Sequence, residues 1–167
     1  MDQSTAQPPV MQPVPMTYAG FWKRFLAYII DSIIISIASL IIIVPIVIMF
    51  GVGALTHDEI GEEAAAGFLI AFLGAYLMLI LVAMIGQWLY FALMESKKGA
   101  TIGKMALGIT VTDMSGNPIT FGKATGRYFG KILSSLILGV GYIMAGFTQQ
   151  KQALHDILSG CLVINKK

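Results

Sequence analysis

Hydrophobic residues dominate two long segments of the chain. The first extends over residues 25–49 and contains a single charged side chain, Asp31. The second, residues 64–94, contains none. At 1.5 Å per residue, about 20 helical residues cross a hydrocarbon core of roughly 30 Å. We therefore expect transmembrane helices at about 25–49 and 67–94.

The composition of the chain agrees with membrane insertion. Hydrophobic residues make up 56% of the 167 residues and charged residues only 12%, whereas soluble domains carry about 25% charged residues. The apolar segments exceed what one core of this size can bury. The single cysteine, Cys161, excludes an internal disulfide and a cysteine-based metal site. These features predict an integral membrane protein.

The N-terminal segment has a different character. Residues 1–16 contain four prolines and three glutamines but no lysine or arginine. Such a segment cannot bury enough apolar surface to become ordered, and it lacks the basic start of a signal peptide. We expect a disordered cytoplasmic tail over residues 1–17 and one membrane domain over residues 18–167.

The charged residues are segregated by sign. The segment between the two apolar runs carries four carboxylates and no basic side chain, whereas residues 95–127 are rich in lysine and arginine. Cytoplasmic loops of membrane proteins carry the excess of basic residues. We therefore expect a multi-pass protein of the bacterial cytoplasmic (inner) membrane, with the basic loop 95–127 and the N-terminus in the cytoplasm. The basic side chains of this loop are Lys97, Lys98, Lys104, Lys123 and Arg127.

The basic loop also indicates which partners to expect. Few aromatic residues lie between its basic side chains, so nucleic acid is not an expected partner. Anionic lipid headgroups at the cytoplasmic face of the bilayer explain the basic residues better.

A third apolar stretch, at about residues 128–148, is compatible with two paths. It either crosses the membrane or turns near Gly139 and returns to the cytoplasm. Two short β-branched segments, residues 109–112 and 161–164, favour the return. Lone strands in a helical protein are expected to pair with each other, and this requires both on one side of the membrane. That path gives a cytoplasmic C-terminus.

Together these segments predict an all-α membrane protein. It would be a small helical bundle with two full transmembrane helices, a third spanning or re-entrant helical segment, and a short cytoplasmic β-strand pair. With so few spans, one copy is not expected to enclose a pathway, so a homo-oligomer is implied.

Asp31 is the most informative polar residue of the first apolar run. An ionised aspartate at that depth costs on the order of 3 kcal/mol, so it is expected to face other helices or water. Arg24 lies seven residues earlier and on the same helical face, which also carries Tyr28, Ser32 and Ser36. This polar face is either a contact surface that joins helices or a solvated path for an ion.

Asp156 is the second candidate. It could hold Arg24 or Arg127 at the membrane interface, and we expect this structural pairing rather than a role in ion passage. Its neighbour His155 is expected to be a solvated interfacial histidine, although an imidazole there could also change its charge near neutral pH. Gln87 is the one strongly polar side chain of the second apolar run.

The sequence does not contain a recognisable catalytic pattern. There is no Ser/His/Asp or Cys/His set and no pair of carboxylates that would flank a cleft, so an enzyme and a cofactor are not expected. His57, a lone histidine in the acidic segment, is expected to be solvated rather than bound to a metal.

Three motifs occur in order along the chain. Residues 18–31 read YAGFWKRFLAYIID, residues 101–111 read TIGKMALGITV, and residues 154–160 read LHDILSG. Taken together, they resemble the RDD family of bacterial membrane proteins, which is named for one arginine and two aspartates. The resemblance extends from Tyr18 to Ile164.

The resemblance implies that Arg24, Asp31 and Asp156 are the characteristic residues of the family. Members often carry arginine where this chain has Lys104 and Lys151, and lysine keeps the charge without the planar fork needed for bidentate contacts. The family is generally described as membrane proteins of poorly known role. Transport has been proposed for it, and some members are linked to cation/proton exchange.

Two functional hypotheses follow. In the first, the protein transports small cations or protons; Asp31 binds and releases the ion, and Arg24 tunes its charge. In the alternative, the protein is a non-transporting membrane scaffold or accessory subunit, and Arg24, Asp31 and Asp156 form a buried polar lock that specifies the fold.

Overall fold

The computed structural model describes residues 16–55 and 61–166. In chain order its helices are α1 (Phe21–Leu55), α2 (Glu62–Lys98), α3 (Ile102–Ala106), α4 (Phe121–Leu136), α5 (Val140–Ile143) and α6 (Leu154–Ser159), with the 3-10 turn η1 (Met144–Gly146) after α5. The strands are β1 (Ile109–Asp113) and β2 (Cys161–Asn165). This architecture confirms the predicted helical fold with one short strand pair. Most of the predicted tail and His57 of the acidic segment lie outside the described residues.

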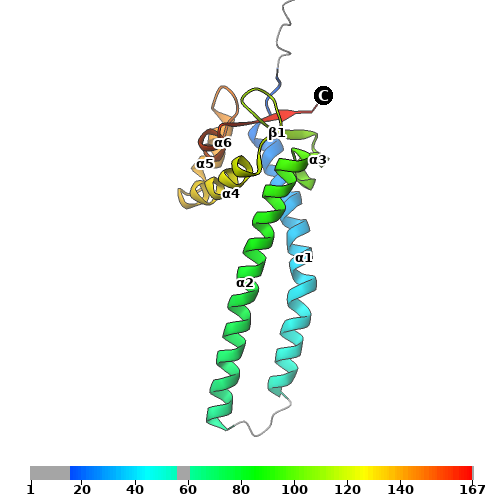
Figure 1. Ribbon diagram of the computed structural model, residues 1–167, viewed down its shortest axis with the longest axis vertical. Helices are drawn as coiled ribbons and strands as arrows, with labels where there is room; N and C mark the ends of the chain where they lie inside the picture. Colours follow the sequence, from blue (N-terminus) through cyan, green and yellow to red (C-terminus); the bar gives the residue numbers. More distant parts are fainter. Residues whose placement is uncertain (1–15, 56–60, 167) are drawn as a thin grey trace, which may run out of the picture.

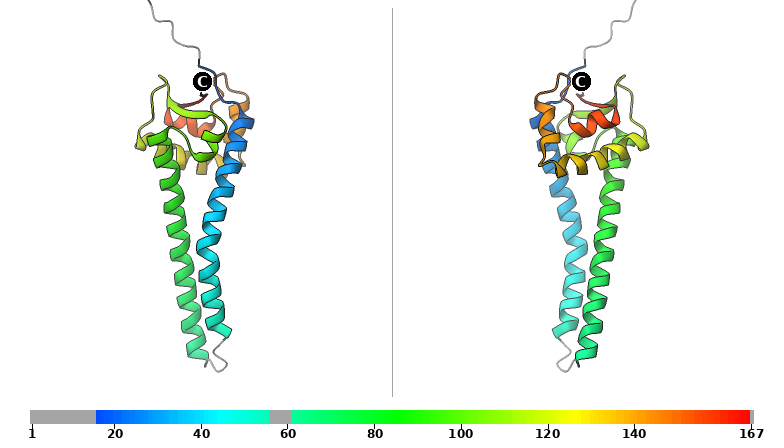
Figure 2. Two further views of the ribbon diagram at one scale, coloured as in Figure 1. Left: turned by 90° about the vertical axis from the view of Figure 1, so that its right-hand side faces the viewer. Right: turned by 90° about the vertical axis from the view of Figure 1, so that its left-hand side faces the viewer.

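Helices α1 and α2 form two long rods that lie side by side (Figures 1 and 2). Each is long and apolar enough to cross a membrane, over Phe21–Gly53 and Ala66–Lys98. The most apolar part of each helix has no buried side chains, as expected for surfaces that face lipid. The two predicted transmembrane helices are therefore confirmed, and both extend beyond their predicted ends.

The remaining elements gather at one end of the rods and form a compact head (Figure 1). Within it, β1 and β2 pair antiparallel, from Ile109 opposite Asn165 to Asp113 opposite Cys161. The two strands predicted from the sequence therefore pair with each other. The chain before α1 lies along β2, because the Ala19 amide donates to Val163 O at 2.9 Å and the Asn165 amide donates to Thr17 O at 2.8 Å.

The third apolar stretch is bent rather than straight. Helix α4 and the α5–η1 segment meet at 117°, and the turn between them contains Leu138 and Gly139, both with positive φ. The turn predicted near Gly139 is therefore present. Since α4 follows the β1 turn and the segment leads into α6 and β2, it begins and ends in the head. Its most exposed apolar side chains are Leu136, Leu138 and Phe147.

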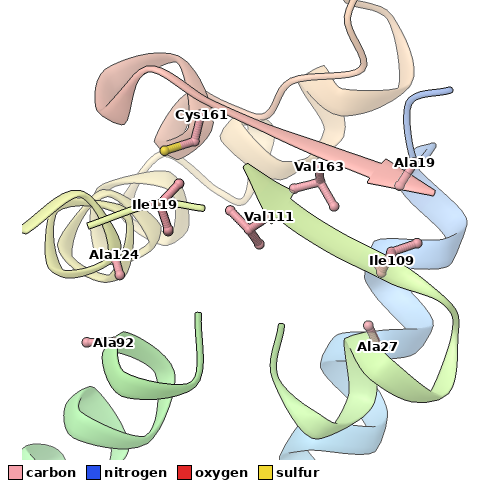
Figure 3. Close-up of a cluster of buried hydrophobic side chains, with 9 residues drawn as sticks. All are labelled: Ala19, Ala27, Ala92, Ile109, Val111, Ile119, Ala124, Cys161 and Val163. Atoms are coloured by element: carbon pink, nitrogen blue, oxygen red, sulfur yellow. The ribbon is translucent and has the colours of Figure 1, made fainter. Parts of the chain in front are cut away.

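A small apolar core lies beneath the strand pair (Figure 3). Alanines supply much of it, which lets α1, α2 and α4 approach the sheet closely. Trp88 and Leu107 pack against its edge. Its buried members are Ala19, Ala27, Ala92, Ile109, Val111, Ile119, Ala124, Cys161 and Val163.

Gly103 sets the distance between α3 and α1. A Cβ atom at this position would overlap the backbone carbonyl of Ala27. Backbone atoms cannot rotate away as a flexible side chain can, so only glycine permits this approach. The close contact brings the N-terminal turn of α3 against the buried face of α1.

We expect Gly103→Ala to destabilise the head by roughly 1–3 kcal/mol, because α3 must move away from α1. Thermal unfolding of the purified protein in detergent measures this change. Gly126→Ala on α4 is the matched control, since nothing lies within 4 Å of its added Cβ. The control should be neutral or up to about 1 kcal/mol more stable. Equal stability of the two variants would contradict the predicted overlap.

Candidate functional site

Arg127 lies at the centre of a buried ion network between three helices. Its side chain is 1% exposed, and its Nε lies 3.0 Å from Glu95 Oε2 on α2. Its Nη1 lies 2.7 Å from Asp156 Oδ1 on α6. These ion pairs lack good hydrogen-bond angles, so the contact is mainly electrostatic. One arginine of α4 thus neutralises carboxylates from two other helices.

Asp156 also binds a second arginine. Its Oδ2 accepts from Arg24 on α1 and from the amide of Ala153 at 3.1 Å, while Arg24 Nε donates to Ala19 O at 2.9 Å. Burial alone would raise the pKa of Asp156, but Arg127 and Arg24 outweigh it and hold this pKa well below its ordinary value. The carboxylate therefore stays ionised and joins α1 to α4.

Glu95 is surrounded by three basic side chains. Besides Arg127 it pairs with Lys104 of α3, and its Oε1 lies 3.4 Å from Lys131 Nζ. Lys131 also lies over the ring of Phe91, with Nζ 4.3 Å from the ring centre. Burial lowers the pKa of Lys104 to about 8, although Glu95 opposes this effect. Among the described residues, the ion network consists of Arg24, Glu95, Lys104, Arg127, Lys131 and Asp156.

Asp31 is separate from this network. The carboxylate is 1% exposed; its Oδ1 accepts from the Tyr90 hydroxyl at 2.9 Å and the Gly103 amide at 2.8 Å. Its Oδ2 accepts from the Thr101 hydroxyl at 2.5 Å. Asp31 thus caps the N-terminal turn of α3, where unpaired amides favour a negative charge.

Asp31 and Arg24 do not pair with each other. Among the described residues no basic side chain lies within ion-pair distance of Asp31, and Arg24 binds Asp156 instead. The two residues share one helical face, but each contacts a different part of the head. The interpretation of Asp156 as a partner for Arg24 or Arg127 is confirmed, since it binds both.

The other predicted residues fall into two groups. Tyr28 is 59% exposed but lines a cavity beside the network, and Ser32 is half-buried. Ser36 and Gln87 are exposed on the membrane-facing part of the helices, and neither is among the described partners of Asp31 or of the network. The predicted polar stripe therefore contributes to the site only near the end of α1 that lies in the head.

His155 is buried. The expectations that its side chain is solvated, or that its charge changes near neutral pH, are therefore wrong. Its ring lies 5.3 Å from that of Tyr142, and Nε2 lies 3.6 Å from Asp156 Oδ1. Burial lowers the pKa of His155 to about 3, helped by Arg127, Lys131 and Lys104 and opposed by Asp156. The imidazole is therefore neutral at physiological pH.

A cavity of about 300 Å³ lies beside the network. Arg24 and Asp31 of α1, Arg127 and Lys131 of α4, and His155 of α6 all line it. Aromatic side chains complete the wall, including Phe21 and Phe25. Among the described residues there is no cluster of His, Cys, Asp or Glu side chains with the arrangement of a metal site.

Sequence reasoning missed Glu95, Tyr90 and Thr101 as parts of the site. Glu95 carried a usable signal, since it is the one carboxylate at the junction between a charge-free run and a basic loop. Buried bases need a counter-charge, and a carboxylate at this junction is a candidate to supply it. Tyr90 and Thr101 carried no such signal, because their roles depend on how α3 packs against α1.

The family model for the RDD family matches residues 18–160. The chain belongs to the RDD family. The uncharacterized protein YxaI of Bacillus subtilis (strain 168) is 40% identical over 151 residues, covering 89% of this chain and 97% of YxaI. The uncharacterized membrane protein YteJ of the same organism is 28% identical over 156 residues, covering 90% of this chain and 82% of YteJ. No solved structure matches the chain.

The geometry explains why the three RDD motifs occur together. Asp31 of the first motif binds Thr101 and the Gly103 amide of the second, at the start of α3. Arg24 of the first motif binds Asp156 of the third. Lys104 of the second motif makes a single ion pair with Glu95, for which the planar fork of arginine is not needed. The motifs are thus the contact points of one RDD head.

We expect Asp156→Asn to destabilise the protein by roughly 3–5 kcal/mol, because Arg24 and Arg127 lose the carboxylate that neutralises both. Thermal unfolding in detergent measures the loss. The matched control is Asp113→Asn, where an amide oxygen can still accept from Ser115 and Asn117 in the turn after β1. A loss below about 1 kcal/mol for Asp156→Asn would show that the ion pair contributes little.

The buried, neutral His155 predicts acid sensitivity. Its folded pKa of about 3 lies below the ordinary 6.5, so the unfolded chain binds a proton between these values that the folded protein does not. Stability is therefore full above pH 6.5 and falls as the pH drops, by roughly 1.4 kcal/mol per pH unit. Unfolding midpoints between pH 7.5 and 5 measure this slope. His155→Asn should flatten it, and equal slopes for both proteins would refute this role of His155.

Proposed function

We propose that this RDD protein is a membrane scaffold or accessory subunit, and that its arginine and two aspartates are structural. The observation that carries this proposal is the environment of Asp31. Both carboxylate oxygens are engaged by donors from Tyr90, Thr101 and Gly103. An ion-binding carboxylate must exchange its partners in each cycle, whereas Asp31 holds α3 against α1.

The ion network supports the same conclusion. Arg24, Glu95, Arg127 and Asp156 connect α1, α2, α4 and α6 at the level where the rods enter the head. Breaking one pair would leave a buried charge without its partner, which is costly. The network therefore fixes a rigid head on two membrane helices, and a rigid head is suited to present a surface to other proteins.

The membrane part of the protein also favours a scaffold. The central parts of α1 and α2 have no buried side chains, so one copy encloses no route through the bilayer within the described residues. These helices can pack against lipid, against a second copy or against helices of a partner. We propose assembly in the membrane, with a homo-oligomer as the simplest form.

We further propose that the head lies on the cytoplasmic side of the bacterial inner membrane. The head carries most of the basic residues, including Lys97, Lys98 and Lys123, and basic residues are retained in the cytoplasm. The start of α1 and strand β2 lie together in the head, so both termini would then be cytoplasmic.

Transport of small cations or protons is the competing proposal. It is favoured by one observation, that Asp31 lines the cavity beside Arg24. The charge around the cavity opposes it, because Arg24, Lys104, Arg127 and Lys131 outnumber the nearby carboxylates and would repel a cation. This balance makes the scaffold the better-supported function.

Flux measurements in proteoliposomes separate the two proposals. We expect no cation-linked or pH-linked flux above that of empty vesicles, from either the native chain or Asp31→Asn. The variant should instead lose roughly 1–2 kcal/mol of stability, because Thr101 no longer donates to a carboxylate. Asp113→Asn, which removes a partly exposed carboxylate at the end of β1, serves as the matched control.

Flux from the native chain that disappears in a folded Asp31→Asn variant would establish a transporter and refute the scaffold. Extraction of the full-length protein in mild detergent tests the assembly itself. A scaffold should elute with a second copy or with another membrane protein. Elution as a monomer without any bound protein would count against the scaffold proposal.

A further inference from the structure

The cavity beside the ion network has a charged floor and an apolar rim. The side chains of Arg24, Arg127 and Lys131 line it and are 13%, 1% and 19% exposed. Phe25 and Ile143 also line it and are 43% and 48% exposed, so they lie nearer the surface. Its volume of about 300 Å³ is at the lower end of the range of small-molecule sites. The fold therefore provides a compartment in which a basic surface adjoins an apolar one.

The basic groups of the cavity retain capacity for an anion. Arg24 Nη2 is buried and has no hydrogen-bond partner among the described residues. Lys131 Nζ reaches Glu95 only at 3.4 Å, while an ammonium has three protons to donate. Glu95 and Asp156 are shared among four basic side chains, so the network is positive overall.

Asp31 also lines the cavity but leaves its formal charge positive, because four basic side chains stand against three carboxylates. Its oxygens accept from Tyr90, Thr101 and Gly103 on the side of α3. The imidazole of His155 contributes no charge. An anion that enters the cavity would therefore meet Arg24 and Lys131 first.

The apolar rim lies next to surfaces suited to the bilayer. On one side is the first part of α1, with Phe25 and Tyr28. On the other is the turn between α4 and α5, where Leu138 is 93% exposed and Leu136 is 75% exposed. Large apolar side chains so exposed are expected to contact lipid rather than water. A ligand that enters here would pass from acyl chains to basic groups.

We propose that this cavity binds the phosphate group of an anionic phospholipid, whose acyl chains leave between α1 and the α4–α5 turn. Arg24 and Lys131 hold the phosphate, and the aromatic rim contacts the glycerol and the first part of the chains. A zwitterionic lipid binds less well, because its quaternary ammonium group is repelled by the same basic side chains. This is a defined site for one lipid, distinct from diffuse attraction between surface lysines and the membrane.

Native mass spectrometry of the full-length protein tests the site. The protein is mixed with equal amounts of phosphatidylglycerol and phosphatidylcholine in detergent, and the retained lipid is counted. We expect the native chain to retain one phosphatidylglycerol, and Lys131→Gln to lower this affinity on the order of tenfold, because a charge-assisted contact is lost. Lys123→Gln is the matched control: it removes the same charge from an exposed position of the same helix.

A second variant tests the cavity without changing its charge. Ser135 is exposed on α4, one turn after Lys131, and lines the cavity. We expect Ser135→Phe to fill part of the cavity and to prevent retention of phosphatidylglycerol. The loss of the 3.1 Å hydrogen bond between the Ser135 and Tyr142 hydroxyls should lower the unfolding midpoint only slightly, because both groups are near solvent. This arm keeps the test valid if Lys131→Gln folds poorly.

Three outcomes would overturn the proposal. Equal loss in Lys123→Gln and Lys131→Gln would indicate diffuse surface attraction. Equal retention of the two lipids would show that the charge of the cavity does not discriminate between anionic and zwitterionic headgroups. Displacement of phosphatidylglycerol by millimolar inorganic phosphate would assign the site to a soluble anion instead of a lipid.

Discussion

The contact on which the rest of the structure depends is the burial of Arg127 between Glu95 and Asp156. A guanidinium cannot lose its proton to escape burial, so it must be matched by carboxylates from its surroundings. Here the two carboxylates come from different helices, and the second of them also binds Arg24 of α1. The positions of four helices are therefore coupled to the position of one side chain. The apolar core of the head is made largely of alanines and short β-branched residues, and by itself it would allow these helices to slide.

The three characteristic residues of the family act in two separate ways. Arg24 and Asp156 belong to the ion network and join the beginning of the membrane domain to its end. Asp31 has no basic partner among the described residues. Its carboxylate accepts hydrogen bonds from Thr101 and from the Gly103 amide at the start of α3. The sequence pattern that unites them reflects their common location at the junction between the rods and the head. It does not mean that all three act on one another, because Arg24 and Asp156 pair with each other whereas Asp31 binds the start of α3.

Much of the fold could be predicted from the sequence because it follows from local composition. The lengths of the apolar runs determine α1 and α2, the short β-branched segments determine β1 and β2, and Gly139 marks the turn after α4. The site was less accessible, since helical periodicity places Arg24 and Asp31 on one face but does not say what packs against it. Two arginines and two aspartates allow several pairings, and the correct one depends on how α4 and α6 cross. His155 was misjudged for the same reason: its burial comes from Tyr142 and α4, which are distant from the motif that contains it.

The distance along the chain between Arg24 and Asp156 has a consequence for biosynthesis. The two residues are separated by 132 positions, and β2, which holds the segment before α1, is made after both. Helices α1 and α2 therefore enter the bilayer while Arg24 and Glu95 still lack their final partners. Their charges must be hydrated or bound to lipid phosphate until the ribosome has released nearly the whole protein. Closure of the head is thus a late, post-insertion event, and a chain that ends before α6 would retain its membrane helices but could not assemble the junction above them.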